Sequence, residues 1–150
     1  EVLSQVESIT EDRNLTTDTS KKIIELNSKY GFRKIGIDDG GVGFGVWSEL
    51  IDDSRTKRKT IALNNASRDK DADGKKHSKI LKEEMYILLQ VMMEKGRILL
   101  LNDEEIKASL MSIQHDDGKI FGSNAHITEG IIRAVWLAEK AKGLKLFCVY

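Results

Sequence analysis

The sequence predicts an α/β protein in which helices and short strands alternate along the chain. Compact apolar runs that suit buried strands alternate with longer stretches of helical period. Clusters of glycine, aspartate and asparagine separate many of these segments, as turns do. A chain of 150 residues, 40% of them hydrophobic, is large enough for one domain with its own core. We therefore expect a single α/β domain built in layers.

The first half of the chain carries the signals of three strands and two helices. The expected elements are a strand at 1–9, a helix at about 17–30, a strand at 33–37, a helix at about 43–53 and a strand at 60–63. Thr17 and Asp18 are expected to cap the first helix, and Gly31 to end it. The second helix is expected to turn one apolar face inward, formed by Val46, Trp47, Leu50 and Ile51.

The second half continues the alternation after a polar loop. The expected elements are a loop at 64–78, a helix at about 79–95 ended by Gly96, a strand at 97–101, a short helix at 103–110, alternating runs at 110–115 and 119–122, a helix at about 125–142 and a tail at 144–150. Asp116, Asp117 and Gly118 lie between the two alternating runs, which predicts a β-hairpin.

Charge and composition exclude several classes of protein. The 24 basic and 24 acidic residues cancel, so any binding of DNA requires a local basic patch. No apolar run approaches the ~20 residues that cross a bilayer, so we expect no membrane partner. The lone Cys148 excludes an internal disulfide and fits a reducing cytoplasm.

Asp38 and Asp39 stand between an expected strand and an expected helix, followed by a glycine cluster. A carboxylate at such a junction is held by rigid backbone beside a helix N-terminus, where a divalent cation and a phosphate can bind. An ordinary turn, with Asp39 capping the helix, explains the same residues. A nucleotide-binding domain is a further alternative, although the glycines do not match G-x-G-x-x-G and no G-K-[ST] follows.

Three polar residues fall within one narrow arc of the last expected helix, namely His126, Glu129 and Arg133. Glu129 and Arg133 are spaced to form an i,i+4 ion pair. The alternative is that Glu129, with His126 one turn earlier, lies opposite Asp38 across a metal ion. The spacing of these residues leaves both interpretations open.

The long helix and the polar loop before it hold further charged residues. Glu84 falls within the apolar arc of that helix. Because glutamate is rarely buried without a partner, we expect Glu84 to pair with a base or to support a metal site from outside the ligand shell. Residues 69–74 imitate the first half of a calcium-binding loop, but the bidentate glutamate at its twelfth position is missing. Lys75 and Lys76 suit contacts with phosphate, or a solvated surface.

Three segments, taken in order, resemble the nuclease domain of viral terminase large subunits. The first, KIGIDDGGVGFGVWSELI, resembles that family's segment of strand, acid, Gly-x-Gly and helix. The second, KILKEEMYILLQVMMEKGRILLLNDEEIKASLMSIQHDDGKI, is similar to its long helix, G-x-I-x-L strand, DDEE helix and hairpin. The third, HITEGIIRAVWLAEKAKG, resembles its closing helix. The resemblance covers roughly residues 15–143 and depends on all three segments occurring in this order.

The resemblance implies an RNase H-like fold, in which a three-layer arrangement holds a mixed β-sheet flanked by helices. It also implies two-metal cleavage of DNA at the start and end of genome packaging. Asp38 and Glu129 match the family's acids as catalytic residues and metal ligands. Asp39 and His126 are expected as additional ligands of Mg²⁺ or Mn²⁺. Glu129 stands where the family usually has an aspartate. Because a glutamate side chain is longer, the backbone of Glu129 has to lie farther from the metal ion.

The same resemblance implies where the protein works and with what. The substrate would be double-stranded DNA, and the portal protein and the terminase small subunit would be partners in the full assembly. The host-cell cytoplasm is the expected location, during virion assembly. Lys75, Lys76 and Lys119 are the basic residues expected to contact DNA.

The chain departs from the family at its start. Nothing in residues 1–32 looks like the strand that carries the family's first catalytic aspartate, and no P-loop of the motor ATPase occurs. We therefore expect a piece of a longer terminase, or a truncated, non-catalytic assembly module without the first strands. Missing strands would leave an exposed sheet edge, through which a homo-oligomer can form.

Overall fold

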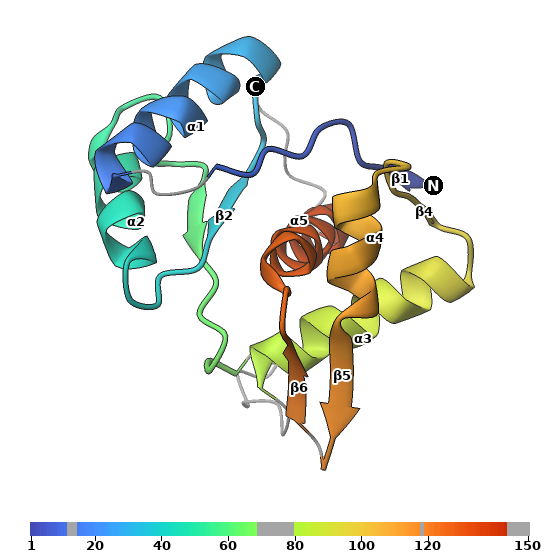
Figure 1. Cartoon of the computed structure of the whole chain (residues 1–150). Coiled ribbons are helices and arrows are strands. Elements are labelled where there is room, and N and C mark those ends of the chain that lie inside the picture. Colours follow the sequence, from blue (N-terminus) through green and yellow to red (C-terminus); the bar gives the residue numbers. More distant parts are fainter. Residues whose placement is uncertain (12–14, 69–79, 118, 144–150) are drawn as a thin grey trace. The chain divides into compact units, whose positions relative to one another are not determined.

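A computed structural model describes residues 1–11, 15–68, 80–117 and 119–143 of the chain, with residues 141–143 described by their backbone alone. Within these ranges the protein is a mixture of five helices and six short strands, and the strands form three two-stranded sheets (Figure 1). The predicted α/β class is confirmed. The three-layer RNase H-like arrangement stays a prediction, and the predicted tail with Cys148 lies outside the described residues.

The chain divides into two compact units, which we describe separately. Unit 1 comprises Glu1–Thr10 and Glu83–Glu139, and unit 2 comprises Glu11–Lys82 and Lys140–Tyr150. The predicted organisation as one domain is not tested by this division and stays a prediction.

Unit 2 is built around a pair of parallel strands. Its elements are α1 (Thr16–Tyr30), β2 (Ile35–Ile37), α2 (Gly43–Asp52) and β3 (Thr60–Ala62) (Figure 1). The two strands pair in parallel, which requires a crossover, and α2 supplies it. The predicted order of helices and strands is therefore confirmed here, with strands shorter than expected.

The core of unit 2 lies where α1 and α2 pack together against β2. Leu50 is completely buried, and Val46 and Ile35 are buried beside it. The partly buried residues that pack against these three are Ile23, Ile24, Phe32 and Ile37. The spacing of Val46 and Leu50 is that of one helical face, so their predicted inward orientation is confirmed. Trp47 and Ile51, predicted to face inward with them, are half-buried.

The prediction for the end of α1 is confirmed, and the prediction for its beginning is wrong. Gly31 ends the helix in the left-handed conformation, with φ of 63°, and its N–H donates to the carbonyl of Asn27, as predicted. The prediction that Thr17 and Asp18 cap the helix was wrong, because both lie inside its first turn. The helix begins earlier because the carbonyl of Leu15 already accepts from the N–H groups of Asp18 and Thr19. Asp18 still favours this end, where its charge meets the positive end of the helix dipole.

Unit 1 holds the remaining elements. They are β1 (Leu3–Ser4), α3 (Leu81–Glu94, whose first two residues belong to unit 2), β4 (Ile98–Leu99), α4 (Glu104–Met111), β5 (Ile113–Asp116), β6 (Lys119–Gly122) and α5 (His126–Gly143, whose last four residues belong to unit 2). β1 pairs with β4 in parallel, although the two are far apart in the sequence. A buried hydroxyl pair joins α4 to α5, with 2.8 Å between Ser109 Oγ and Thr128 Oγ1.

The predicted β-hairpin of unit 1 is confirmed, with a corrected start. β5 and β6 pair antiparallel, and Asp116 lies opposite Lys119. Asp117, in the turn, has φ of 43°, as the tightest hairpin turns require. The first strand begins at Ile113 rather than at residue 110, because α4 continues through Met111. Asp103 precedes α4 as its cap, accepting from the N–H groups of two residues in the first turn.

Replacing Leu50 by alanine tests the core of unit 2. Leu50→Ala removes a completely buried side chain, so the free energy of unfolding should fall by about 2–5 kcal/mol in urea denaturation. Val42→Ala is the matched control, because Val42 is 77% exposed and its truncation should change stability by less than about 0.5 kcal/mol. Equal destabilisation in the two variants would contradict this core.

Candidate functional site

Asp38 follows the last residue of β2 and has both carboxylate oxygens fixed by hydrogen bonds. The N–H of Gly40 donates to Asp38 Oδ1 at 3.1 Å, and Asn65 Nδ2 donates to Asp38 Oδ2 at 3.2 Å. The residue is half-buried. The carboxylate is therefore held in one orientation.

The strand register brings Asn65 to Asp38. Ile37 lies opposite Ala62, and the N–H of Leu63 donates to the carbonyl of Ile37 at 2.8 Å. The residues that follow β2 and β3 therefore meet at the carboxyl edge of the strand pair. Sequence reasoning did not select Asn65 for the site. The signal was the polar Asn64-Asn65 pair directly after an apolar run, in the same position as the acids after β2.

The glycine cluster after Asp39 closes the chain tightly around Asp38. A Cβ atom at Gly43 would overlap the carbonyl oxygen of Asp38, and one at Gly40 would press on the Asp38 carboxylate. Gly41 has φ of 58°, a conformation that side chains other than glycine rarely adopt. The glycines thus serve the turn that leads into α2.

Asp39 contributes a second carboxylate at the same turn. Its Oδ1 atom is buried and has no hydrogen-bond partner among the described residues. A buried acceptor without a donor costs free energy, and a charged one costs more. A cation or a hydrogen-bond donor at this oxygen would therefore stabilise the turn. The alternative prediction that Asp39 caps α2 is wrong, because the residue before α2 is Val42 and no side chain caps the helix.

On α5, Glu129 is ion-paired with Arg133. Arg133 Nη1 donates to the backbone carbonyl of Glu129 at 2.8 Å and lies 3.6 Å from Glu129 Oε2. The predicted i,i+4 ion pair is thus confirmed. The Arg133 side chain is 8% exposed and that of Glu129 is 21% exposed. His126 is exposed, at the first residue of the helix.

The charges of this ion pair influence the pKa of Tyr86 on α3. Burial first, and then the charge of Glu129, raise the pKa of the Tyr86 hydroxyl, the charge of Arg133 opposes them, and the resulting pKa is about 12. Glu84, two residues earlier on the same helix, is half-buried. Its predicted support of a metal site stays a prediction. Glu129 therefore lies in a partly buried polar region of unit 1.

The structure brings together some of the predicted residues and not others. Asp38 and Asp39 share one turn of unit 2, whereas His126 and Glu129 belong to unit 1, and their joint binding of a metal ion stays a prediction. The described ranges contain no group of three or more acidic, histidine or cysteine residues placed to hold a metal ion.

The residues predicted to contact DNA are described only in part. Lys119 is exposed at the start of β6. Lys75, Lys76 and the calcium-like loop at 69–74 lie outside the described residues. No helix in the described ranges is long and apolar enough to span a membrane.

Comparisons of the chain with models of protein families, with curated proteins and with solved structures find no match. The resemblance to terminase nuclease domains therefore depends on the three sequence segments and stays a prediction.

The raised pKa of Tyr86 predicts a loss of stability in alkali. The folded state favours the neutral hydroxyl. The stability that this preference gives to the fold is therefore complete below the unfolded pKa of about 10, and it is lost as the pH rises to about 12. Melting temperatures measured from pH 9 to 12 should fall less steeply in Tyr86→Phe than in the wild type. Tyr30→Phe, at a tyrosine that is 46% exposed, should keep the wild-type profile. Parallel profiles for the wild type and Tyr86→Phe would refute the assignment.

Proposed function

We propose that this chain is a metal-dependent DNA endonuclease domain of the terminase large-subunit type, with an RNase H-like fold. The observation that carries the proposal is the Asp38 carboxylate, fixed by Gly40 and Asn65 where two parallel strands end. Clefts at the carboxyl ends of parallel strands are where open α/β sheets bind their ligands. The proposed substrate is the phosphodiester backbone of double-stranded DNA.

The oxygen atoms at this turn suit a hard divalent cation. Mg²⁺ and Mn²⁺ prefer carboxylate and carbonyl oxygens, and Asp38 and Asp39 offer two carboxylates on adjacent residues. The buried Oδ1 of Asp39 has no hydrogen-bond partner among the described residues, so a cation would relieve its desolvation. Bound divalent cations would supply an activated water and stabilise the leaving oxygen. The role of Asp38 is to hold its oxygens in a fixed direction, since Gly40 and Asn65 remove its rotational freedom.

Glu129 is the second acid of the proposal. Arg133, on the same helix, balances its charge and limits its movement. The proposal gives Arg133 a positioning role through Glu129, and His126 a further ligand role from the first turn of α5.

A second candidate function is a non-catalytic assembly module of the same fold. It is favoured by the lack, in the described ranges, of a group of three or more side chains that could bind metal. Two-metal cleavage requires enough anionic ligands to hold both ions at a fixed separation. A module of this kind would keep the turn at Asp38 without cutting DNA.

Thermal denaturation with Mn²⁺ tests the metal site. A cation that binds only the folded protein should raise the melting temperature by about 3–6 °C at roughly ten times its Kd. Asp38→Asn should abolish the rise, and Glu129→Gln should reduce it. Asp18→Asn, an equal charge change at an exposed residue of unit 2, should leave the rise intact. An equal rise in Asp38→Asn and the wild type would show that Mn²⁺ binds elsewhere.

Nicking of supercoiled plasmid separates the two candidate functions. The endonuclease proposal expects slow nicking that requires Mn²⁺ and disappears in Asp38→Asn and Glu129→Gln, since each removes a negative ligand. Asp18→Asn should nick at the wild-type rate. A chain that shows the Mn²⁺-dependent stabilisation without any nicking would be the assembly module. Nicking that persists in both acid variants would refute the assignment of the site.

A further inference from the structure

Basic residues gather at the amino edge of the β2–β3 pair, the edge away from Asp38. Because the strands are parallel and Ile35 lies opposite Thr60, the residues that directly precede them, Lys34 and Lys59, lie side by side. Arg33 and Lys34 therefore precede β2 at the same edge at which Lys57, Arg58 and Lys59, the last residues of a turn, precede β3. The N–H of Ile35 donates to the carbonyl of Lys59 at 2.9 Å, which fixes this alignment.

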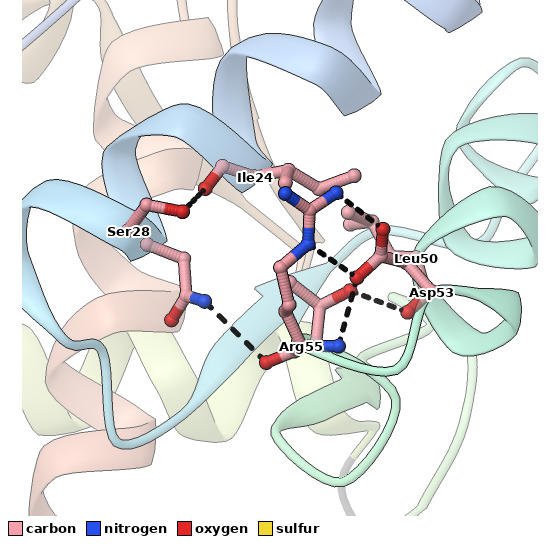
Figure 2. A network of polar contacts seen from close by, with 7 residues as sticks. Ile24, Ser28, Leu50, Asp53 and Arg55 are labelled. Carbon is pink, nitrogen blue, oxygen red and sulfur yellow. Dashed lines mark hydrogen bonds and ion pairs between the residues drawn. The ribbon is translucent and has the colours of Figure 1, made fainter.

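The loop between α2 and β3, residues 53–59, is built from internal hydrogen bonds (Figure 2). Asp53 accepts from the backbone N–H and the guanidinium of Arg55, with the shortest contact at 2.6 Å. The completely buried Thr56 donates its hydroxyl to the carbonyl of Leu50 at 2.7 Å. Two backbone N–H groups of the loop donate to the carbonyl of Asp53. The loop is thus held in one conformation before any ligand arrives.

Asn27 on α1 ties the same loop to the helix. Its Nδ2 donates to the carbonyl of Arg55 at 3.4 Å, and its Oδ1 accepts from Lys59 Nζ at 2.9 Å. Lys29 lies in the last turn of the helix, and its ammonium lies 4.5 Å from the centre of the Tyr30 ring. A further basic side chain therefore lies at the end of the helix that holds the loop.

The positive charges at this edge are only partly balanced within the chain. Arg55 is neutralised by Asp53, and hydrogen bonds from Arg55 lower the pKa of Asp53 to about 2. Lys34, Lys57 and Arg58 are exposed, and the described part of the chain gives none of these three an ion pair. These three exposed cations are therefore accessible to an external anion.

We propose that the amino edge of the β2–β3 pair binds the phosphate backbone of duplex nucleic acid through Lys34, Lys57 and Arg58. A duplex presents one negative charge per about 1.7 Å of its axis, which suits several cations fixed on a rigid loop. Phosphate contacts carry no sequence information, so binding at this surface is independent of sequence.

A duplex fits this surface better than an anionic membrane does. Peripheral membrane binding combines basic residues with apolar side chains that insert between lipids. Of the large hydrophobic side chains exposed in unit 2, Leu15 precedes α1 at the end of the helix away from Lys29, and Val42 and Phe44 follow the opposite, carboxyl edge of β2. Tyr30 is the large exposed aromatic side chain beside Lys29. The surface therefore offers charge with little apolar area for insertion.

This inference does not depend on the proposed nuclease activity, so the test omits metal ions. Binding of a fluorescent DNA duplex of ~20 base pairs is measured by anisotropy in EDTA over a series of salt concentrations. Replacing Lys34, Lys57 and Arg58 together by glutamine should weaken binding on the order of 100-fold at ~0.1 M salt. The slope of log affinity against log salt should become shallower by about 0.9 for each phosphate that the variant no longer neutralises.

The matched control replaces three other exposed lysines of the chain by glutamine, Lys21, Lys22 and Lys95. This variant should keep most of the affinity and the salt slope, and so should Asp38→Asn. Melting temperatures check that each variant is folded, and each of the three single variants should bind the duplex more weakly than the wild type. Equal weakening by both triple variants would overturn the proposal, because net charge would then account for binding. Binding to phosphatidylserine vesicles without binding to DNA would overturn it in favour of a membrane.

Discussion

The parallel pairing of β2 with β3 is the constraint on which the rest of unit 2 depends. A parallel pair places both amino ends at one edge and both carboxyl ends at the other. The register therefore determines which residues meet at each of the two edges. Asp38 meets Asn65 at the carboxyl edge, and Lys34 meets Lys59 at the amino edge. A shift of one residue in this register would separate Asn65 from the Asp38 carboxylate and move the basic residues out of alignment.

Helices α1 and α2 both stabilise this register. Leu50, completely buried on α2, packs with Ile35 of β2, and its carbonyl accepts the buried hydroxyl of Thr56. The contact of Leu50 with Ile35 and the hydroxyl of Thr56 therefore both support the segment that joins α2 to β3. Asn27 adds a connection from α1 to that loop. The strand pair, the loop and the two helices are thus coupled, which explains how strands of three residues remain in place.

In unit 1 a charged side chain is buried and paired, unlike the exposed basic residues of unit 2. Arg133 is buried and Glu129 partly buried on one helix, where Arg133 Nη1 lies 3.6 Å from the Glu129 carboxylate and donates to a backbone carbonyl. Burial of charged groups is tolerated when they are paired and hydrogen-bonded. The same pair influences the hydroxyl of Tyr86, so the helix α5 and the helix α3 share an electrostatic environment. In unit 2 the exposed bases instead keep their charge in solvent, where an external anion can reach them.

The sequence alone determined the features that depend on neighbouring residues. Gly31 and Gly96 adopt the left-handed backbone that follows their helices, and Asp117 adopts the positive φ of a tight hairpin. Glu129 and Arg133 pair because one helical turn separates them. The tertiary structure decided the contacts between residues distant in the chain. Asn65 lies 27 positions after Asp38, and the register of two strands, which no local pattern encodes, brings their side chains together. The basic edge formed for the same reason, since Lys34 and Lys59 are adjacent only through strand pairing.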